Sequence, residues 1–282
     1  MVVFIVLNHR KLNFLFIFIS IALFVLEASI DERYHLLIAF IAAFLIAFVS
    51  FFLKLLTQDG ARAAVMLGLI AYGFGGFESA VILVSLFASS NLVSYIFSKR
   101  IHIESGSGGS RRNGSQVWSN GFWFAFFVCL WYFLKADMLI IAAFGAIATA
   151  CSDTWATEAG FPKSGKTILI TTGEVVTPGT DGGISIPGTI AALLGALFIG
   201  SLTLFFDQNY AAIAATSIAL GGFIGAMADS WLGAYFQYEN RRLPNILEST
   251  VNSDNNSVNF LATGIGSIIT IFIYNILIYG MV

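Results

Sequence analysis

Residues 137–160 read DMLIIAAFGAIATACSDTWATEAG, an apolar run that ends in acidic and hydroxyl side chains. A run of roughly 20 apolar residues is long enough for a helix to cross a bilayer. The same pattern returns at 211–236, where the apolar run ends in ADSW (228–231). Both segments place Asp-(Ser/Thr)-Trp at the end of a span, which indicates a weak internal repeat of parallel orientation.

The composition extends this reading to the whole chain. Of the 282 residues, 57% are hydrophobic and 11% are charged, whereas a soluble globular domain has roughly 25% charged residues. A chain this apolar has too few polar groups to cover its surface in water, which excludes a soluble globular protein. The apolar runs predict an all-α polytopic membrane protein of about nine transmembrane helices. These runs are 12–30, 35–56, 62–77, 78–97, 118–134, 137–157, 187–206, 211–236 and 257–280.

The basic residues orient these spans. If the spans alternate, twelve of the fourteen Lys and Arg residues lie on one side of the membrane and two, Arg33 and Lys135, lie on the other. The positive-inside rule then places the N-terminus in the cytoplasm and the C-terminus outside. The twelve are Arg10, Lys11, Lys54, Arg62, Lys99, Arg100, Arg111, Arg112, Lys163, Lys166, Arg241 and Arg242.

The N-terminal segment, residues 1–34, is a generic transmembrane helix in this scheme. Its apolar run lacks a small-residue cleavage site, so we expect it to be retained. Nothing in it is typical of an organellar transit peptide, which favours a prokaryotic plasma membrane. The two cysteines lie inside apolar runs and the three histidines are scattered, so we expect neither a disulfide framework nor a His/Cys metal site.

Two acids mark the strongest candidate site. Asp153 and Asp229 each end a hydrophobic span, where a carboxylate is costly unless it caps a helix or reaches interfacial water. Two such acids at matched depth favour a shared Mg²⁺, which proteins hold with one or two carboxylates and substrate phosphates. Thr157 shares a helix face with Asp153. Glu158 lies roughly 140° away, so it joins the site only if the helix ends or unwinds there.

Paired arginines precede the fifth span. Arg111 and Arg112 lie close to Gln116 and Asn120, which are spaced to share one helix face. Paired guanidinium groups beside amides suit a phosphate-rich ligand. A plain positively charged cytoplasmic loop with an interfacial Trp118 is the simpler alternative.

Three further segments are candidates at the same depth. Asp59 and Arg62 flank a glycine in the turn 58–62. Residues 177–185 read TPGTDGGIS, in which glycines permit tight turns with exposed backbone N–H groups, as in a phosphate-binding nest. Asn259 lies one turn inside the last span, where it binds a ligand or a neighbouring helix.

Together these motifs resemble one family. DGAR (59–62), RRNGSQVWSNG (111–121), SDTWATEAG (152–160), TTGEVVTPGTDGG (171–183), ADSWLGAYFQ (228–237) and SVNF (257–260) occur in this order. They are similar to the integral membrane family that contains plant phytyl-phosphate kinase and the human transmembrane-protein-nineteen relative. That family is distantly similar to the CTP-dependent phytol and dolichol kinases. Ser119 in place of Ala and Ile184-Ser185 in place of Val-Thr are small departures that remove no polar group.

The resemblance implies a kinase. The expected reaction transfers a phosphoryl group from a nucleoside triphosphate, CTP, to an isoprenoid monophosphate such as phytyl, geranylgeranyl or farnesyl phosphate. Residues 35–282 would form the membrane-embedded catalytic domain, with its active site facing the cytoplasm. Expected partners are the nucleotide, the isoprenoid phosphate, Mg²⁺ and membrane lipids, with no nucleic acid; a homo-oligomer is compatible with the sequence.

The implied roles follow the motifs. Asp153 and Asp229 would hold Mg²⁺, with Asp181 or Glu158 as a third ligand. The turn Gly179–Gly183 would cradle the triphosphate, and Arg111 and Arg112 would bind the triphosphate or the acceptor phosphate. The remaining candidates for binding substrate or nucleotide are Asp59, Arg62, Gln116, Asn120, Thr157, Gly179, Thr180, Gly182, Gly183 and Asn259.

Other functions stay open at this stage. A kinase acting on an isoprenoid alcohol would need a general base, and no His lies in the inner-face motifs. A lipid transporter or flippase also fits parallel repeats and intramembrane acids, but transport sites lie near the bilayer midplane. Another lipid head-group transferase would share the same Mg²⁺–phosphate chemistry.

Overall fold

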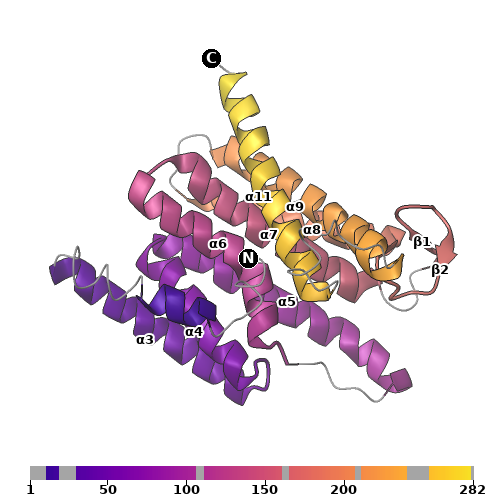
Figure 1. Ribbon diagram of the computed structural model, residues 1–282, viewed down its shortest axis with the longest axis horizontal. Coiled ribbons are helices and arrows are strands. Elements are labelled where there is room, and N and C mark those ends of the chain that lie inside the picture. Colours follow the sequence, from indigo (N-terminus) through magenta and orange to yellow (C-terminus); the bar gives the residue numbers. More distant parts are fainter. Residues whose placement is uncertain are drawn as a thin grey trace.

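Long apolar helices make up most of the computed structural model (Figure 1). The structure describes residues 11–18, 30–105, 111–160, 165–206, 211–239 and 254–280. Within these ranges, seven helices are long and apolar enough to cross a membrane. They are α3 (Ile30–Phe52), α5 (Gly76–Ser105), α6 (Gly114–Leu134), α7 (Asp137–Gly160), α8 (Ile186–Leu202), α9 (Ala211–Leu232) and α11 (Asn255–Tyr279). The predicted polytopic helical fold is therefore confirmed.

The remaining two predicted spans differ from these seven. The first, at 12–30, lies largely outside the described residues, of which 11–18 are helical. The third forms α4 (Gln58–Gly73), whose 16 residues are fewer than a bilayer crossing normally needs. The chain turns sharply at Gly75-Gly76, because α4 ends at Gly73 and Gly76 opens α5 with φ of +76°.

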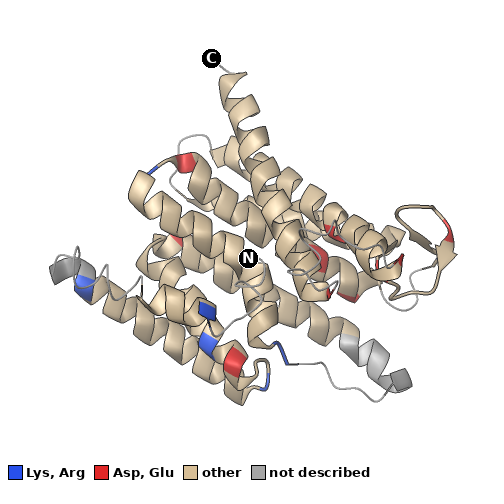
Figure 2. Ribbon diagram, viewed as in Figure 1, with Lys and Arg blue, Asp and Glu red and all other residues tan. Residues whose placement is uncertain are grey.

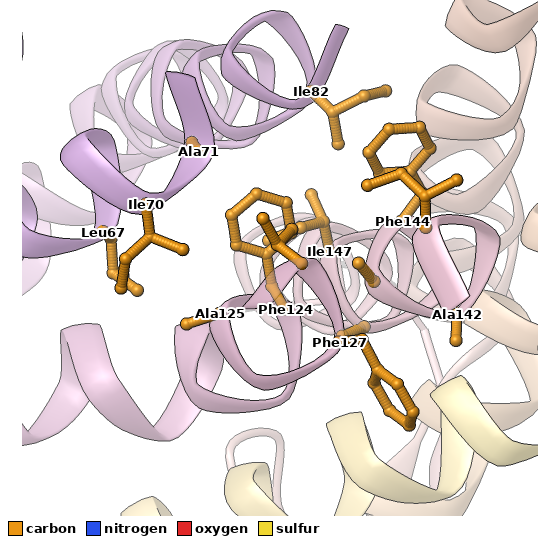
Figure 3. Packing of buried hydrophobic residues seen from close by; sticks show 14 of the residues in the cluster. Leu67, Ile70, Ala71, Ile82, Phe124, Ala125, Phe127, Ala142, Phe144 and Ile147 are labelled. Atoms are coloured by element: carbon orange, nitrogen blue, oxygen red, sulfur yellow. The ribbon is translucent and has the colours of Figure 1, made fainter. Parts of the chain in front are cut away.

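Helix α7 forms the centre of the bundle. Its neighbours include α5, α6, α8, α9 and α11, and its side chains from Leu139 to Ser152 are buried. Figure 3 shows Phe144 and Ile147 of α7 among Phe124 and Phe127 of α6 and Ile82 of α5. In contrast, α3 packs mainly against α4. It leaves a row of apolar side chains exposed, as expected of a helix that faces lipid.

Glycines let these helices approach closely. A Cβ atom at Gly222 would lie 2.5 Å from the Cβ of Ala148, and one at Gly200 would lie 2.6 Å from the Ala215 carbonyl oxygen. Small residues at such interfaces stabilise membrane helices by direct backbone packing.

Five helix ends meet at one end of the bundle, where the polar motifs gather. They are the N-terminal ends of α6, α8 and α11 and the C-terminal ends of α7 and α9. Side chains cap the N-termini here: Asn113 caps α6, Ser185 caps α8 and Asp254 caps α11. Figure 2 shows tan helix bodies with acidic segments gathered where α7, α9 and α11 approach the small sheet.

A small antiparallel sheet joins α7 to α8, which the all-α prediction did not include. Its strands are β1 (Thr167–Leu169), β2 (Val175–Val176) and β3 (Gly183–Ile184), in the order β2-β1-β3. Ile168 is paired with Val175 on one side and Ile184 on the other. At the far end of α8 a short 3₁₀ turn, η1 (Thr203–Phe205), follows. Helix α9 continues into a π-helix, η2 (Gly233–Tyr238).

Candidate active site

A polar cavity of about 460 Å³ lies where the five helix ends and the sheet meet. Most of the residues predicted from the sequence to form the site line this cavity. They are Arg112, Gln116, Asn120, Asp153, Thr157, Glu158, Gly179, Thr180, Asp181, Gly182, Gly183, Asp229 and Asn259. Segments up to 147 residues apart in the sequence, from Arg112 to Asn259, thus surround one space.

Three acids face this cavity from different elements. Asp153 on α7 and Asp229 on α9 are partly buried, and Asp181 is exposed on the turn before β3. The charged neighbours that act most strongly on Asp229 are the other two acids, Asp153 and Asp181. Like charges gathered in a partly buried cavity repel one another, so the arrangement favours a bound cation.

The donor set fits Mg²⁺. Carboxylate oxygens are hard ligands, and Mg²⁺ is usually bound by one or two carboxylates together with water and phosphate oxygens. Within the described ranges, no three His, Cys, Asp or Glu side chains lie close enough together to hold a metal ion by themselves. A metal at Asp153 and Asp229 would therefore take other ligands from water or a phosphate group.

Asn259 on α11 holds Asp229 in place. This side chain is only 7% exposed. In the amide orientation that satisfies both of its ends, its NH₂ group donates to Asp229 Oδ1 at 3.0 Å and to the Asn255 carbonyl oxygen at 3.2 Å. Asn259 therefore orients a carboxylate of the cavity, which unites two of its predicted roles, a helix–helix contact and a place in the site.

The glycine-rich turn presses against the end of α9. Gly179 and Gly182 have φ of +88° and +75°, a conformation that glycine adopts without steric cost. A Cβ atom at Gly182 would collide with the backbone and side chain of Ala234. Two N–H groups of the turn are used internally, since Thr180 N donates to Thr177 O at 3.2 Å and Gly183 N to Thr180 O at 2.9 Å. The turn thus has fewer N–H groups for a phosphate than the predicted nest.

Arg112 forms another wall of the cavity, and hydrogen bonds hold its backbone in place. Its N–H donates to the Leu55 carbonyl oxygen at 3.0 Å, and its carbonyl oxygen accepts from Thr57 N at 3.1 Å. Burial lowers the pKa of its guanidinium, and the negative charge of Glu158 acts in the opposite direction. Because arginine keeps its proton in proteins, Arg112 brings a positive charge to the cavity.

Gln116 and Asn120 lie on the same wall, as their spacing predicted. Part of their polar capacity stabilises α6: Gln116 Oε1 accepts from Asn113 N at 3.0 Å in a capping box, and Asn120 Nδ2 donates to the Gln116 carbonyl oxygen at 3.1 Å. The NH₂ group of Gln116 is not used by the capping box. It is the part of this side chain suited to an anionic ligand.

Glu158 lines the cavity although α7 is continuous through it. The expectation that the helix would have to end or unwind there was wrong, because the cavity extends past α7 to Arg112 and α6. Glu158 accepts a hydrogen bond from Ser94 Oγ of α5 at 2.6 Å and interacts electrostatically with Arg112. These contacts associate Glu158 with Arg112 rather than with Asp229 of α9.

Asp59, Arg62 and Arg111 are not among the residues that line the cavity. Asp59 Oδ2 accepts from Gly114 N at 2.8 Å and its Oδ1 from Thr57 Oγ1 at 2.6 Å, so it joins the start of α4 to the start of α6. Arg62 and Arg111 are exposed. Asp59 thereby supports the segment that carries Arg112.

Trp118 and Trp231 differ in their exposure. Trp118 is fully buried, stacks on Phe16 with ring centroids 5.0 Å apart and donates to Asn13 Oδ1 at 2.8 Å. The reading of Trp118 as an interfacial side chain was therefore wrong, because residues 11–18 cover it. Trp231 in the repeated motif is 47% exposed, which suits the membrane surface.

Helix N-termini add positive potential to the cavity. Gln116 of α6, Gly188 of α8 and Asn255 of α11 each lie in the first turn or so of their helix and line the cavity. Unpaired N–H groups and the helix dipole make such ends favourable for anions. Arg112 and these helix ends bring positive potential to the same cavity that the acids line, so it suits both a cation and phosphate.

Several polar lining residues were not predicted as site residues. They include Thr167, Thr189, Ser230, Gln237 and Asn255. Asn255 stands four residues before Asn259, a spacing that could have revealed it. Gln237 lies in the π-helix, whose wider turn changes the face on which a residue falls, and sequence periodicity contains no signal for it.

Comparison with known proteins identifies relatives along most of the chain. The family model described as "Integral membrane protein DUF92" matches residues 41–267. "Uncharacterized membrane protein MJ0933" of Methanocaldococcus jannaschii is 32% identical over 254 residues, which cover 87% of this chain and 98% of the relative.

Two relatives come from Arabidopsis thaliana. "Protein PGR" is 29% identical and the match covers 85% of this chain and 96% of that protein. "Protein VTE6, chloroplastic" is 27% identical, with 80% of this chain and 68% of that protein covered. No solved structure matches. The resemblance drawn from the motifs is thus confirmed, and the chain belongs to the integral membrane protein family DUF92.

Proposed function

We propose that this protein transfers the terminal phosphoryl group of a nucleoside triphosphate, CTP, to an isoprenoid monophosphate. An oxygen of the acceptor phosphate would bond to the γ-phosphorus. The bond from that phosphorus to the β–γ bridging oxygen would break, and the nucleoside diphosphate would leave. The products are an isoprenoid diphosphate and CDP. We infer further that the cavity faces the cytoplasm of a prokaryotic cell, where the nucleotide is found.

The main observation behind this proposal is the set of residues that line the polar cavity at the end of the bundle. Asp153 and Asp229 line it together with Arg112 and the N-terminal ends of α6, α8 and α11. Phosphoryl transfer needs little covalent help from a protein and depends on positioning and charge neutralisation. A lipid with an anionic head would bring its phosphate to this depth. Membership of the family that the motifs resemble supports the same chemistry.

The lining residues favour a phosphate acceptor over an alcohol. A phosphate monoester has a second pKa of about 6 and is largely dianionic at neutral pH, so it is already nucleophilic. An alcohol would need a general base. No His, Lys or Cys is among the described residues that line the cavity, and the carboxylates are those best suited to a metal. Isoprenoid alcohols are accordingly the second choice of acceptor.

Asp153 and Asp229 would hold Mg²⁺, with Asp181 as a charged neighbour of Asp229. When bound, the metal would supply neutralisation of charge on the phosphate oxygens. The chain's own residues would act around it: Asn259 orients Asp229, Arg112 holds a phosphate group, and the turn Gly179–Gly183 closes over the nucleotide.

The deciding experiment is phosphoryl transfer by purified protein in detergent. It would combine γ-³²P-labelled CTP and Mg²⁺ with phytyl, geranylgeranyl or farnesyl phosphate, or with the free alcohols. We expect labelled diphosphate, loss of the activity with EDTA, and its return with added Mg²⁺. Asp153→Asn should lower the rate by at least about 100-fold. Asp137→Asn, an exposed acid at the other end of the same helix, is the matched control.

Absence of transfer to every acceptor from ATP, CTP or UTP, by protein that unfolds cooperatively, would refute the proposal. Faster transfer to alcohols than to monophosphates would keep the kinase and overturn the acceptor. Labelled product from wild type and Asp153→Asn alike would remove the acid pair from the mechanism.

A further inference from the structure

A second, apolar groove lies beside the polar cavity. It has a volume of about 130 Å³ and is lined by α3, α4, α5 and α6. Small side chains create much of its space, among them Ala43 and Ala47 of α3 and Ala64 and Gly68 of α4. Its lining is almost entirely hydrocarbon apart from one end.

That end is shared with the polar cavity. Arg112, Gln116 and Asn120 line both spaces. Arg112 therefore stands at the junction of an apolar groove and a polar cavity. Its backbone is held by Leu55 and Thr57, so the segment before α4 positions the residue that carries this charge.

The groove also opens at the surface of the helix bundle. Ile46 of α3 and Val84 of α5 line it and are nevertheless 48% and 44% exposed. Both belong to helices that are long and apolar enough to cross a membrane. Their exposed faces therefore meet lipid, and the groove provides a sideways entry from the bilayer.

We propose that this groove binds the isoprenoid tail of the acceptor, with the acceptor phosphate on Arg112 and the nucleotide on the side of Asp153 and Asp229. The inference rests on the proposed function and assigns its two substrates to the two ends of the site. An anionic head on a long apolar tail matches a fixed positive charge at the inner end of an apolar groove. Because hydrocarbon contact continues along the groove, tail length becomes a determinant of the KM.

The first test is a substitution that narrows the groove, followed by measurement of the KM for each substrate. Val84→Trp places a large ring at its mouth, and Leu92→Trp is the matched control, since Leu92 is 59% exposed on the same helix and lines neither space. With Val84→Trp, the KM for geranylgeranyl phosphate should rise by about tenfold, since excluding two methylene groups from an apolar site is sufficient for this. The KM for geranyl phosphate, with half the chain, and for CTP should change by less than about twofold. Equal effects of the two substitutions, or equal effects on both acceptors, would overturn the inference.

A second measurement does not depend on turnover or on the variant folding. Wild-type protein would be irradiated with a geranylgeranyl phosphate analogue that carries a diazirine along its tail, and the labelled peptides identified. We expect label in α4 and α5, reduced by excess geranylgeranyl phosphate. Such labelling without transfer in any assay would uphold the groove and refute the kinase. Transfer without labelling of these helices, or labelling reduced by phospholipid alone, would uphold the kinase and refute the groove.

Discussion

Asp153 and Asp229 are held close together by a fold that gains no stability from their mutual charge. Asp181 lines the same cavity, and Asp153 and Asp181 are the charged neighbours that act most strongly on Asp229. Repulsion of this kind is retained in proteins mainly where a ligand relieves it. Activity and stability should therefore respond in opposite directions to the loss of one acid.

Asp229→Asn should remain folded and unfold at a temperature about 2–4 °C higher than wild type in metal-free buffer, because one repelling charge is gone. Its transfer rate should fall by at least about 100-fold. Differential scanning calorimetry with EDTA, alongside the kinase assay, measures both. Asp254→Ala is the control of opposite sign: it removes the N-cap of α11 and should lower the unfolding temperature. A lower unfolding temperature for Asp229→Asn would indicate that the acid is a structural group.

Substitution of Asn259 tests whether its hydrogen bond orients Asp229. Asn259→Leu removes the donor to Asp229 and should reduce the transfer rate by about 10–100-fold, the usual effect of losing a partner that orients a metal ligand. The apparent Mg²⁺ affinity should fall as well, and a Mg²⁺ titration of the rate measures it. Asn275→Leu lies near the other end of the same helix and should behave as wild type. Equal Mg²⁺ affinities in wild type and Asn259→Leu would exclude the orienting role.

The turn between β2 and β3 is the element whose contact with α9 shapes the cavity. Gly182→Ala should destabilise the protein by more than Gly173→Ala, which is its matched control. Both glycines have φ near +75°, but a Cβ atom at Gly173 would meet nothing within 4 Å, whereas one at Gly182 would collide with Ala234. Gly173→Ala should cost only the conformational term of about 1–2 kcal/mol. The unfolding temperature and the KM for CTP should both differ between Gly182→Ala and Gly173→Ala. Identical values for the two variants would show that the turn does not pack tightly against α9.

Asp59 links two elements through its carboxylate. Asp59→Ala leaves the buried N–H of Gly114 without its acceptor, which should cost about 1–3 kcal/mol of unfolding free energy. Since the same segment positions Arg112, the KM for the isoprenoid phosphate should rise while the Mg²⁺ dependence stays unchanged. Gln58→Ala, at an exposed neighbouring position, is the control. A loss of Mg²⁺ affinity in Asp59→Ala would instead support a direct part in the metal site.

Sequence reasoning was most successful where depth in the membrane decides position. Asp153 and Asp229 end parallel spans of similar length, so their shared cavity followed from counting residues. Asp59 was harder, because its partner Gly114 is 55 residues away and no local spacing connects them. The strands of two or three residues in the 167–184 segment are too short for a hydrophobic alternation to reveal. Glu158 was misjudged because helix angle alone ignores how far a cavity extends.

At the scale of the whole molecule, every described polar cluster of the site lies at one end of the bundle. The positive-inside rule predicts that this end faces the cytoplasm. Val175→Cys, on the exposed sheet, should react with a membrane-impermeant maleimide only in inside-out vesicles, and Asp137→Cys only in right-side-out vesicles. Both variants would be made in a Cys129→Ala background. This background protein should itself show no labelling, because its remaining cysteine, Cys151, is buried. Labelling of both positions from the same side would contradict the predicted number of crossings.

The convergence of five helix ends at one membrane surface has a consequence for the cell. A cavity reached from a single surface, with a groove that opens sideways at the same depth, can exchange lipid only with the adjoining leaflet. If the protein has the proposed function, isoprenoid phosphate in the opposite leaflet would not reach the site until some other process moves that lipid across. The diphosphate product would also return to the leaflet from which the acceptor came, so the two leaflets would contain unequal amounts of it. Transbilayer movement of the acceptor would then limit its supply to the enzyme.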